Sequence, residues 1–196
     1  MQASVIPVSA EGDRRTLQAN PSTTRPFEAA RTGELAAALG LDLQSFAPGP
    51  LWVSTGLEPL LVPLASKEAV SRVSPGATRA GFANASGKVS VYCFSPLAEE
   101  KLSVRFFFAK NAGSVTEDPV TGSACANLGG YAVATGQALP LKRTLRQGEA
   151  AGRPSVPGLA VDAARAIRVS GEVIELGRRH RALVVVLFAL MPDPQD

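Results

Sequence analysis

Residues 122–135 read GSACANLGGYAVAT, and this stretch decides the fold. It is compatible with a single helix, and Gly136 directly after it is a typical helix stop. Apart from Asn127, nearly every residue in it is apolar or small. A helix without a polar face is buried on all sides, and small residues let neighbouring elements approach its backbone. In a strand-rich chain this predicts a central helix wrapped by a curved sheet.

Two further helices are predicted on the N-terminal side of this stretch. Residues 34–39 form one, with Thr32 as candidate N-cap and Gly40 as stop. The other covers residues 66–73 and begins on a serine. Helices and strands do not alternate in the regular way that builds parallel sheets, so the predicted class is α+β.

Strand patterns make up most of the remaining chain. In residues 88–94, Val89, Val91 and Cys93 share one face, which predicts a half-buried strand. Residues 20–26, NPSTTRP, contain two prolines that disfavour regular structure, and we interpret them as a linker. The predicted strands are 4–8, 15–19, 51–54, 60–64, 88–94, 102–108, 142–146, 165–170 and 172–176.

Composition indicates a packed globular protein with no strong charge. The chain has 196 residues, of which 45% are hydrophobic and 19% charged, with a formal net charge of +3. These values exclude a disordered chain and fit one large domain or one domain plus a fragment. The densest basic cluster, at residues 178–181, is short, so we interpret it as solvated and predict no nucleic-acid partner.

The cysteine and histidine counts limit metal and redox chemistry. Cys93, Cys125 and His180 cannot assemble a Cys/His zinc site, so no metal is predicted. Two cysteines give no disulfide framework, which fits a reducing, cytoplasmic location. No signal peptide is visible. The apolar run 182–191 is too short to span a membrane, so we predict no membrane partner and interpret the run as a strand.

The residues before the central helix form a candidate anion site. A helix start has unpaired N–H groups and a partial positive charge. Gly122 would allow a ligand close to that backbone, and Ser123 would add a hydroxyl donor. This combination suits a substrate carboxylate. Asp118 would lie beside it and exchange a proton if burial raised its pKa.

The residues alone leave two alternatives open. Asp118 and Pro119 also form a plain helix-start signal, with Asp118 as N-cap, and Thr121 could cap instead. Cys125 could be a catalytic thiol with a base beside it, or a buried small apolar residue.

Five motifs in sequence order resemble the PhzF-like family, the relatives of the phenazine-biosynthesis isomerase. The main one is EDPVTGSA at 117–124, which leads into ANLGGY at 126–131. The others are LWVSTGLEPLLVPL at 51–64, RFF at 105–107, QG at 147–148 with GRPS at 152–155, and IRVSGE at 167–172. The resemblance covers roughly residues 1–177.

The resemblance implies a diaminopimelate epimerase-like fold, in which each of two lobes curls a mostly antiparallel sheet round a central buried helix. It also implies an isomerase that moves a proton next to the carboxylate of a small substrate, without a metal or an organic cofactor. By position, Asp118 would be the acid/base or polar partner. Gly122 and Ser123, with Thr121 beside them, would bind the carboxylate.

The sequence also departs from that family. Its members have an N-terminal lobe with a catalytic Glu and a Gly-His motif, which this sequence lacks. We therefore expect strands left from the first lobe at 1–27, the C-terminal lobe at 28–177 and an unmatched tail at 178–196. The site would need a complementing N-terminal lobe, and a homodimer is a further expectation. The alternative function is an inactive anion-binding or protein-interaction module.

Overall fold

The computed structural model describes residues 6–74, 82–84, 86–111 and 114–174. Its helices are α1 (Thr32–Leu39), α2 (Lys67–Arg72) and α3 (Gly122–Ala134), with 3-10 turns η1 (Ala29–Arg31) and η2 (Leu43–Ser45). Its strands are β1 (Val8–Glu11), β2 (Arg14–Gln18), β3 (Thr23–Pro26), β4 (Leu51–Ser54), β5 (Leu60–Pro63), β6 (Ser90–Ala98), β7 (Lys101–Asn111), β8 (Ser114–Asp118), β9 (Leu141–Arg146), β10 (Gly158–Val161) and β11 (Ile167–Glu172).

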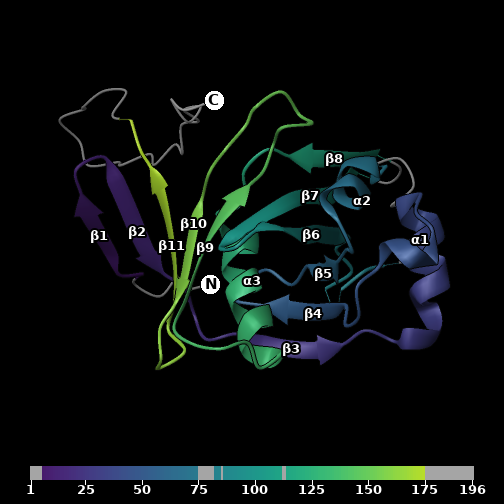
Figure 1. Ribbon diagram of the computed structural model, residues 1–196, viewed down its shortest axis with the longest axis horizontal. Helices are drawn as coiled ribbons and strands as arrows, with labels where there is room; N and C mark the ends of the chain where they lie inside the picture. The colour runs from purple at the N-terminus through teal and green to yellow at the C-terminus, as the bar shows by residue number, and fades with distance from the viewer. Residues whose placement is uncertain (1–5, 75–81, 85, 112–113, 175–196) are drawn as a thin grey trace.

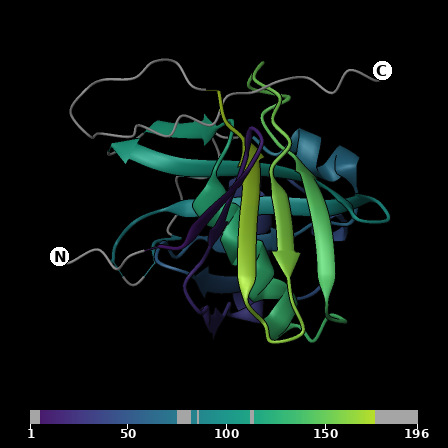
Figure 2. The same ribbon diagram turned by 90° about the vertical axis from the view of Figure 1, so that its left-hand side faces the viewer.

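Within the described residues, eleven strands form one sheet. Its order is β1-β2-β11-β10-β9-β7-β6-β5-β4-β3, with β8 paired to β7 beside this path. The pairs β5–β6 and β7–β9 are parallel, and the other pairs are antiparallel. Strands β9 to β11 run across the direction of β4 to β7, so the sheet bends around α3 (Figures 1 and 2). The prediction of a curved, mostly antiparallel sheet is confirmed.

Helix α3 lies on the concave side of this sheet. All of its residues from 124 to 132 are buried, among side chains of β4 to β7 and β9 to β11. A Cβ on Gly129 would lie 2.7 Å from Ile167 Cγ2, and one on Gly130 would lie 2.6 Å from Ser22 Cβ. Glycine therefore allows the close packing there, and the predicted central helix is confirmed.

A second hydrophobic cluster covers the other face of β4 to β7. It includes Leu35 and Leu39 of α1 and Val70 of α2. Strand β6 contributes Val91 and Cys93 to this cluster but Tyr92 and Phe94 to the α3 cluster. The prediction that this strand is half-buried is therefore wrong, because helices cover both of its faces.

The sheet divides at β7. One edge of β7 pairs with β6, while the other pairs first with β9, at Lys101–Ser103, and then with β8, from Phe106 onward. The chain leaves β8 at Asp118 and enters α3 at Gly122. The end of β8 and the start of α3 therefore lie at the fork of the sheet.

Several predicted boundaries need correction. The stretch 20–26 is not simply a linker, because Thr23–Pro26 pairs with β4 as an edge strand. The first hairpin strand is Val8–Glu11, not 4–8, and residues 1–5 lie outside the described residues. The two strands expected in 165–176 are one strand, β11, while β8 and β10 were not predicted.

The predicted helix ends are confirmed at three of four positions. Gly40 ends α1 in the left-handed conformation, and Gly136 follows the end of α3 with φ +71°. The Ser66 side chain caps α2 by accepting from Ala69 N. Thr32 is not an N-cap, because it lies inside α1 and donates its hydroxyl to Ala29 O. The predicted strand 182–191 and the basic cluster fall outside the described residues. No helix within the described ranges is long and apolar enough to cross a membrane.

Candidate functional site

The candidate site is the short connection from β8 into α3. Asp118 is the last residue of β8, where it pairs with Phe106, and Gly122 is the first residue of α3. The first helical hydrogen bond runs from Cys125 N to Thr121 O. The amides of Gly122 and Ser123 precede it, so they have no partner within the helix.

Neither proposed side-chain cap is formed. Asp118 is not the N-cap, because the helix begins four residues later. Thr121 occupies the N-cap position, but its side chain makes no capping bond and donates instead to Asp118 Oδ2 at 2.8 Å. The helix start therefore keeps its N–H groups and its partial positive charge for another acceptor.

Exposure differs among the four predicted site residues. Thr121 is buried, Asp118 and Gly122 are half-buried, and Ser123 is exposed. A Cβ on Gly122 would meet no atom within 4 Å, so there is open space beside that backbone. The structure thus brings Asp118, Thr121, Gly122 and Ser123 together around one accessible helix start.

A buried hydrogen-bond chain lies behind this connection. Gln147 is 1% exposed and directly follows β9. Its Nε2 donates to Asp118 O at 2.8 Å and to Thr121 Oγ1 at 3.3 Å. Its Oε1 accepts from the hydroxyl of Tyr92 at 3.1 Å. These hydrogen bonds therefore link the β8–α3 connection to Tyr92, on the face of β6 that packs against α3.

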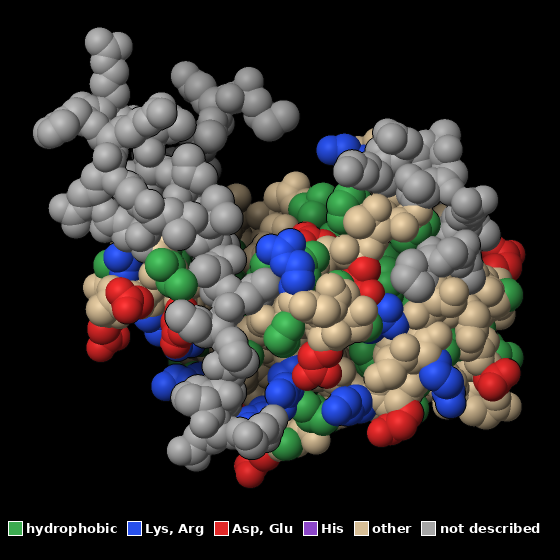
Figure 3. Space-filling model, turned by 90° about the horizontal axis from the view of Figure 1, so that it is seen from above, with side chains coloured by type: hydrophobic (Ala, Val, Ile, Leu, Met, Phe, Trp, Pro, Cys, Tyr) green, Lys and Arg blue, Asp and Glu red, His purple; other side chains and the backbone are tan. Residues whose placement is uncertain are grey.

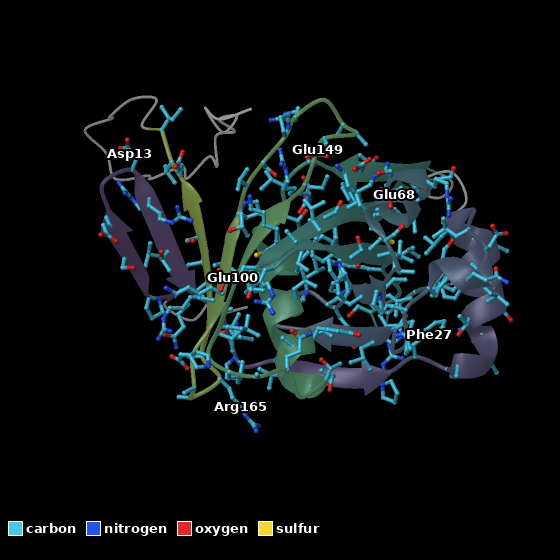
Figure 4. The ribbon with its side chains drawn as sticks, viewed as in Figure 1. Asp13, Phe27, Glu68, Glu100, Glu149 and Arg165 are labelled. Carbon is cyan, nitrogen blue, oxygen red and sulfur yellow. The ribbon has the colours of Figure 1, made fainter. Side chains whose placement is uncertain are left out.

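The loop after β9 clamps the same connection. Gly148 has φ +79°, and a Cβ there would collide with the carbonyl oxygens of Arg153 and Pro119. Ser155 donates its hydroxyl to Pro119 O at 2.9 Å, and its backbone pairs with Gln147. In Figure 4, Glu149 marks this loop, at the opposite end of the sheet from Arg165.

Glu117, next to the predicted acid/base residue, has a structural partner. Arg105 binds both of its carboxylate oxygens, at 3.0 and 2.7 Å, and both side chains are largely buried. The same guanidinium donates to the carbonyls of Val70, Ser71 and Val73 at the end of α2. This ion pair fixes β8 against α2.

The two thiols are buried and unreactive in character. Burial raises the pKa of Cys125, and likewise that of Cys93, to about 12. Cys125 Sγ lies 3.9 Å from Gly158 O, and its neighbourhood is the α3 cluster. The structure favours the small apolar role for Cys125 over a catalytic thiol. His180, the only histidine of the sequence, falls outside the described residues.

A cavity of about 350 Å³ lies elsewhere, along the second half of α3. Its walls include Leu128 and Tyr131 of α3, Arg143 of β9 and Glu100 of the β6–β7 turn, and none of the predicted site residues lines it. Figure 4 shows Glu100 well away from the loop that carries Glu149. In the view of Figure 3, acidic and basic side chains are interspersed over the described surface. Within the described ranges, no group of three or more His, Cys, Asp or Glu side chains could hold a metal ion.

Sequence reasoning did not identify the supporting residues Gln147, Tyr92 and Arg105. Arg105 and Gln147 belong to quoted motifs, but their partners lie 12 to 55 residues away. The one signal for Gln147 was its place in the QG motif at 147–148, to which the sequence analysis assigned no role.

Comparison with known proteins identifies a family and several relatives of this chain. A family model described as phenazine biosynthesis-like protein (PhzC-PhzF) matches residues 4–176. Among curated proteins, an uncharacterized isomerase of Pasteurella multocida is 37% identical over 128 residues, which are 64% of this chain and 42% of that protein.

Solved structures share the fold. A PhzF-family phenazine biosynthesis protein of Bacillus anthracis has a TM-score of 0.64 at 18% identity, over 84% of this chain and 60% of that one. A predicted epimerase of Pseudomonas aeruginosa has a TM-score of 0.63 at 25% identity, over 84% of this chain and 58% of that one. The chain therefore spans less than two thirds of the length of the relatives it matches.

Proposed function

This chain belongs to the phenazine biosynthesis-like (PhzC-PhzF) protein family, and from this premise we propose that it serves an isomerase reaction on a small carboxylate-bearing metabolite. In the proposed reaction a proton is removed from the carbon next to the substrate carboxylate. It is returned to another carbon, or to the opposite face of the same carbon, without a metal or organic cofactor. The uncapped start of α3 beside Asp118 is the observation that carries this proposal.

The substrate carboxylate would bind at the start of α3. The amides of Gly122 and Ser123 are free of helical partners, and the helix dipole favours an anion there. Ser123 is exposed and adds a hydroxyl donor. The open space beside Gly122 lets the ligand approach the backbone.

Asp118 would accept or donate the moving proton. Its Oδ2 is held by Thr121 at 2.8 Å, and its Oδ1 accepts from Val120 N at 3.3 Å. These two bonds fix the carboxylate just before the start of α3. A positioned acid or base of this kind contributes about 10²–10⁴-fold in rate.

A second proton-transfer group would come from a complementing lobe. Among the described residues, the Asp118 carboxylate accepts hydrogen bonds from Val120 N and the Thr121 hydroxyl, and none from another acid or base. The relatives are longer than this chain, so we propose that a Glu-bearing lobe faces Asp118 in the active molecule.

One observation favours the alternative, a binding or interaction module. Strand β1 lies at the sheet edge with all four residues exposed, including Val8 at 61%. An exposed edge strand is a template for pairing with another chain.

Deuterium exchange separates the two functions. An isomerase exchanges the C–H proton next to the bound carboxylate with D2O, whereas a binding module leaves that proton unexchanged.

Thermal unfolding with sodium acetate, against sodium chloride at equal ionic strength, tests the carboxylate site. A ligand that binds only the folded state raises Tm. Gly122→Pro removes one amide donor at a first helical position, which proline tolerates after the extended Thr121. We expect Gly122→Pro and Ser123→Ala to lose most of the acetate-dependent rise.

The matched controls lie in α2. Lys67→Pro changes the first helical position there, and Ser71→Ala removes an exposed helical hydroxyl. Both variants should keep the acetate response of the wild type. An equal response from all five proteins would show that the carboxylate does not bind at the start of α3.

A further inference from the structure

We propose that Gln147 is a positioning residue, which orients the Asp118 carboxylate through the hydroxyl of Thr121. This inference rests on the proposed function, because it assigns a role to the support behind the proton-transfer group. Gln147 contacts the N-cap Thr121 and the carbonyl of Asp118 but no open surface, since it is 1% exposed.

The direction of each hydrogen bond in the chain is fixed by chemistry. A main-chain carbonyl can only accept, so the group 2.8 Å from Asp118 O must be the amide nitrogen of Gln147. The amide oxygen therefore faces Tyr92, and the phenol must donate to it. No other assignment of the amide satisfies both neighbours.

The same logic fixes the proton of Thr121. Its Oγ1 already accepts from Gln147 Nε2 at 3.3 Å. A threonine hydroxyl has one proton, and here that proton points to Asp118 Oδ2 at 2.8 Å. The donors therefore run in one direction, from Tyr92 through Gln147 and Thr121 to the carboxylate.

Burial makes this hydrogen-bond chain sensitive to the loss of any one of its members. Tyr92 is fully buried and Thr121 is 8% exposed, so water cannot replace a lost partner easily. Burial, with smaller contributions from Cys125 and Asp118, raises the pKa of Tyr92 well above its ordinary range, so the phenol remains a donor. The loop after β9 also holds Gln147 rigidly through Ser155.

The consequence for Asp118 is a carboxylate held in one orientation. The bond from Thr121 fixes one of its oxygens toward the buried hydrogen-bond chain, beside the helix start.

Carbon-13 NMR of the Asp118 carboxyl carbon at neutral pH tests this role. Gln147→Met keeps the volume but removes all three bonds of the amide, and Thr121→Val removes the donor to Asp118. In both variants we expect the carboxyl chemical shift to move away from its wild-type position, because this shift responds to hydrogen bonds at the carboxylate. Thr121→Ser keeps the hydroxyl and should keep the wild-type chemical shift.

The control is Ser155→Ala, which removes the hydroxyl bonds to Pro119 O and Gln147 O but leaves the donor chain intact. It should lower Tm without moving the Asp118 carboxyl chemical shift. An unchanged chemical shift in folded Gln147→Met, or an equal change in Ser155→Ala, would overturn the proposal. If Gln147→Met does not fold, comparison of Thr121→Val with Thr121→Ser decides whether the hydrogen bond from residue 121 orients Asp118.

The acetate experiment separates this inference from the proposed function. A moved carboxyl chemical shift in both variants, together with no acetate response in the wild type, would support the positioning role and contradict the carboxylate site. An acetate response with an unchanged chemical shift would do the reverse.

Discussion

Thr121 occupies the N-cap of α3 but gives its hydroxyl to Asp118. A threonine in this position ordinarily caps the helix and contributes about 1 kcal/mol to its stability. Here the hydroxyl supports a carboxylate, and the helix start stays open for a ligand. A stability contribution is thus given up at the place where we propose binding, which is common at functional sites.

At the residue scale we predict that both thiols are protected in the folded chain. Burial raises each thiol pKa to about 12, so almost no thiolate forms at pH 8. Ellman's reagent at pH 8 should label Cys93 and Cys125 only after unfolding. Rapid labelling of Cys125 in the folded chain would contradict its apolar role.

The same shifts give the chain a pH-dependent stability. The unfolded thiols ionise from about pH 8.5, while the folded ones keep their protons up to about pH 12. The folded state therefore binds more protons in this range, so the free energy of unfolding should fall as pH rises through it. Urea unfolding between pH 8 and 10.5 measures this, and a Cys93→Ala, Cys125→Ala variant should show a smaller decline.

At the scale of elements, α3 depends on glycine where the sheet closes around it. A Cβ on Gly130 would lie 2.8 Å from Val53 Cγ1, and one on Gly129 would lie 3.2 Å from Leu159 Cδ1. We predict that Gly129→Ala and Gly130→Ala each destabilise the chain by about 1–3 kcal/mol, although alanine favours helix. Chemical unfolding measures the difference.

Gly33 in α1 is the matched control. A Cβ there meets no atom within 4 Å, so Gly33→Ala should stabilise the chain by about 0.4–1 kcal/mol. If all three substitutions changed stability in the same direction, the close packing around α3 would not explain the effects of Gly129→Ala and Gly130→Ala.

The helices and strands also show which sequence signals were sufficient to predict secondary structure. Helix α3 was predictable because its apolar pattern admits one environment, a fully buried one. Strand β3 was missed because proline suggests a break, yet Pro26 ends an edge strand, where its lack of an N–H is tolerated. Strand β8 was missed because it contains Glu117, whose charge is balanced by Arg105 from the neighbouring strand.

At the scale of the whole molecule, the fork of the sheet explains where the site lies. Strand β7 pairs with β8 along one part of an edge and with β9 along another, and α3 begins between them (Figure 1). The local motif was enough to place Asp118, Gly122 and Ser123 beside one helix start, because they are neighbours in sequence. The supporting chain was not predictable, because Tyr92 and Gln147 meet only after the sheet has formed.

The central claim is that the start of α3 binds a small carboxylate. An amide NMR titration of the chain with sodium acetate, at constant ionic strength, tests it most directly. We predict saturable shifts for the amides of Gly122 and Ser123, with none for Lys67 and Glu68 at the Ser66-capped start of α2. Shifts that are absent, that do not saturate, or that are equal at both helix starts would contradict the claim.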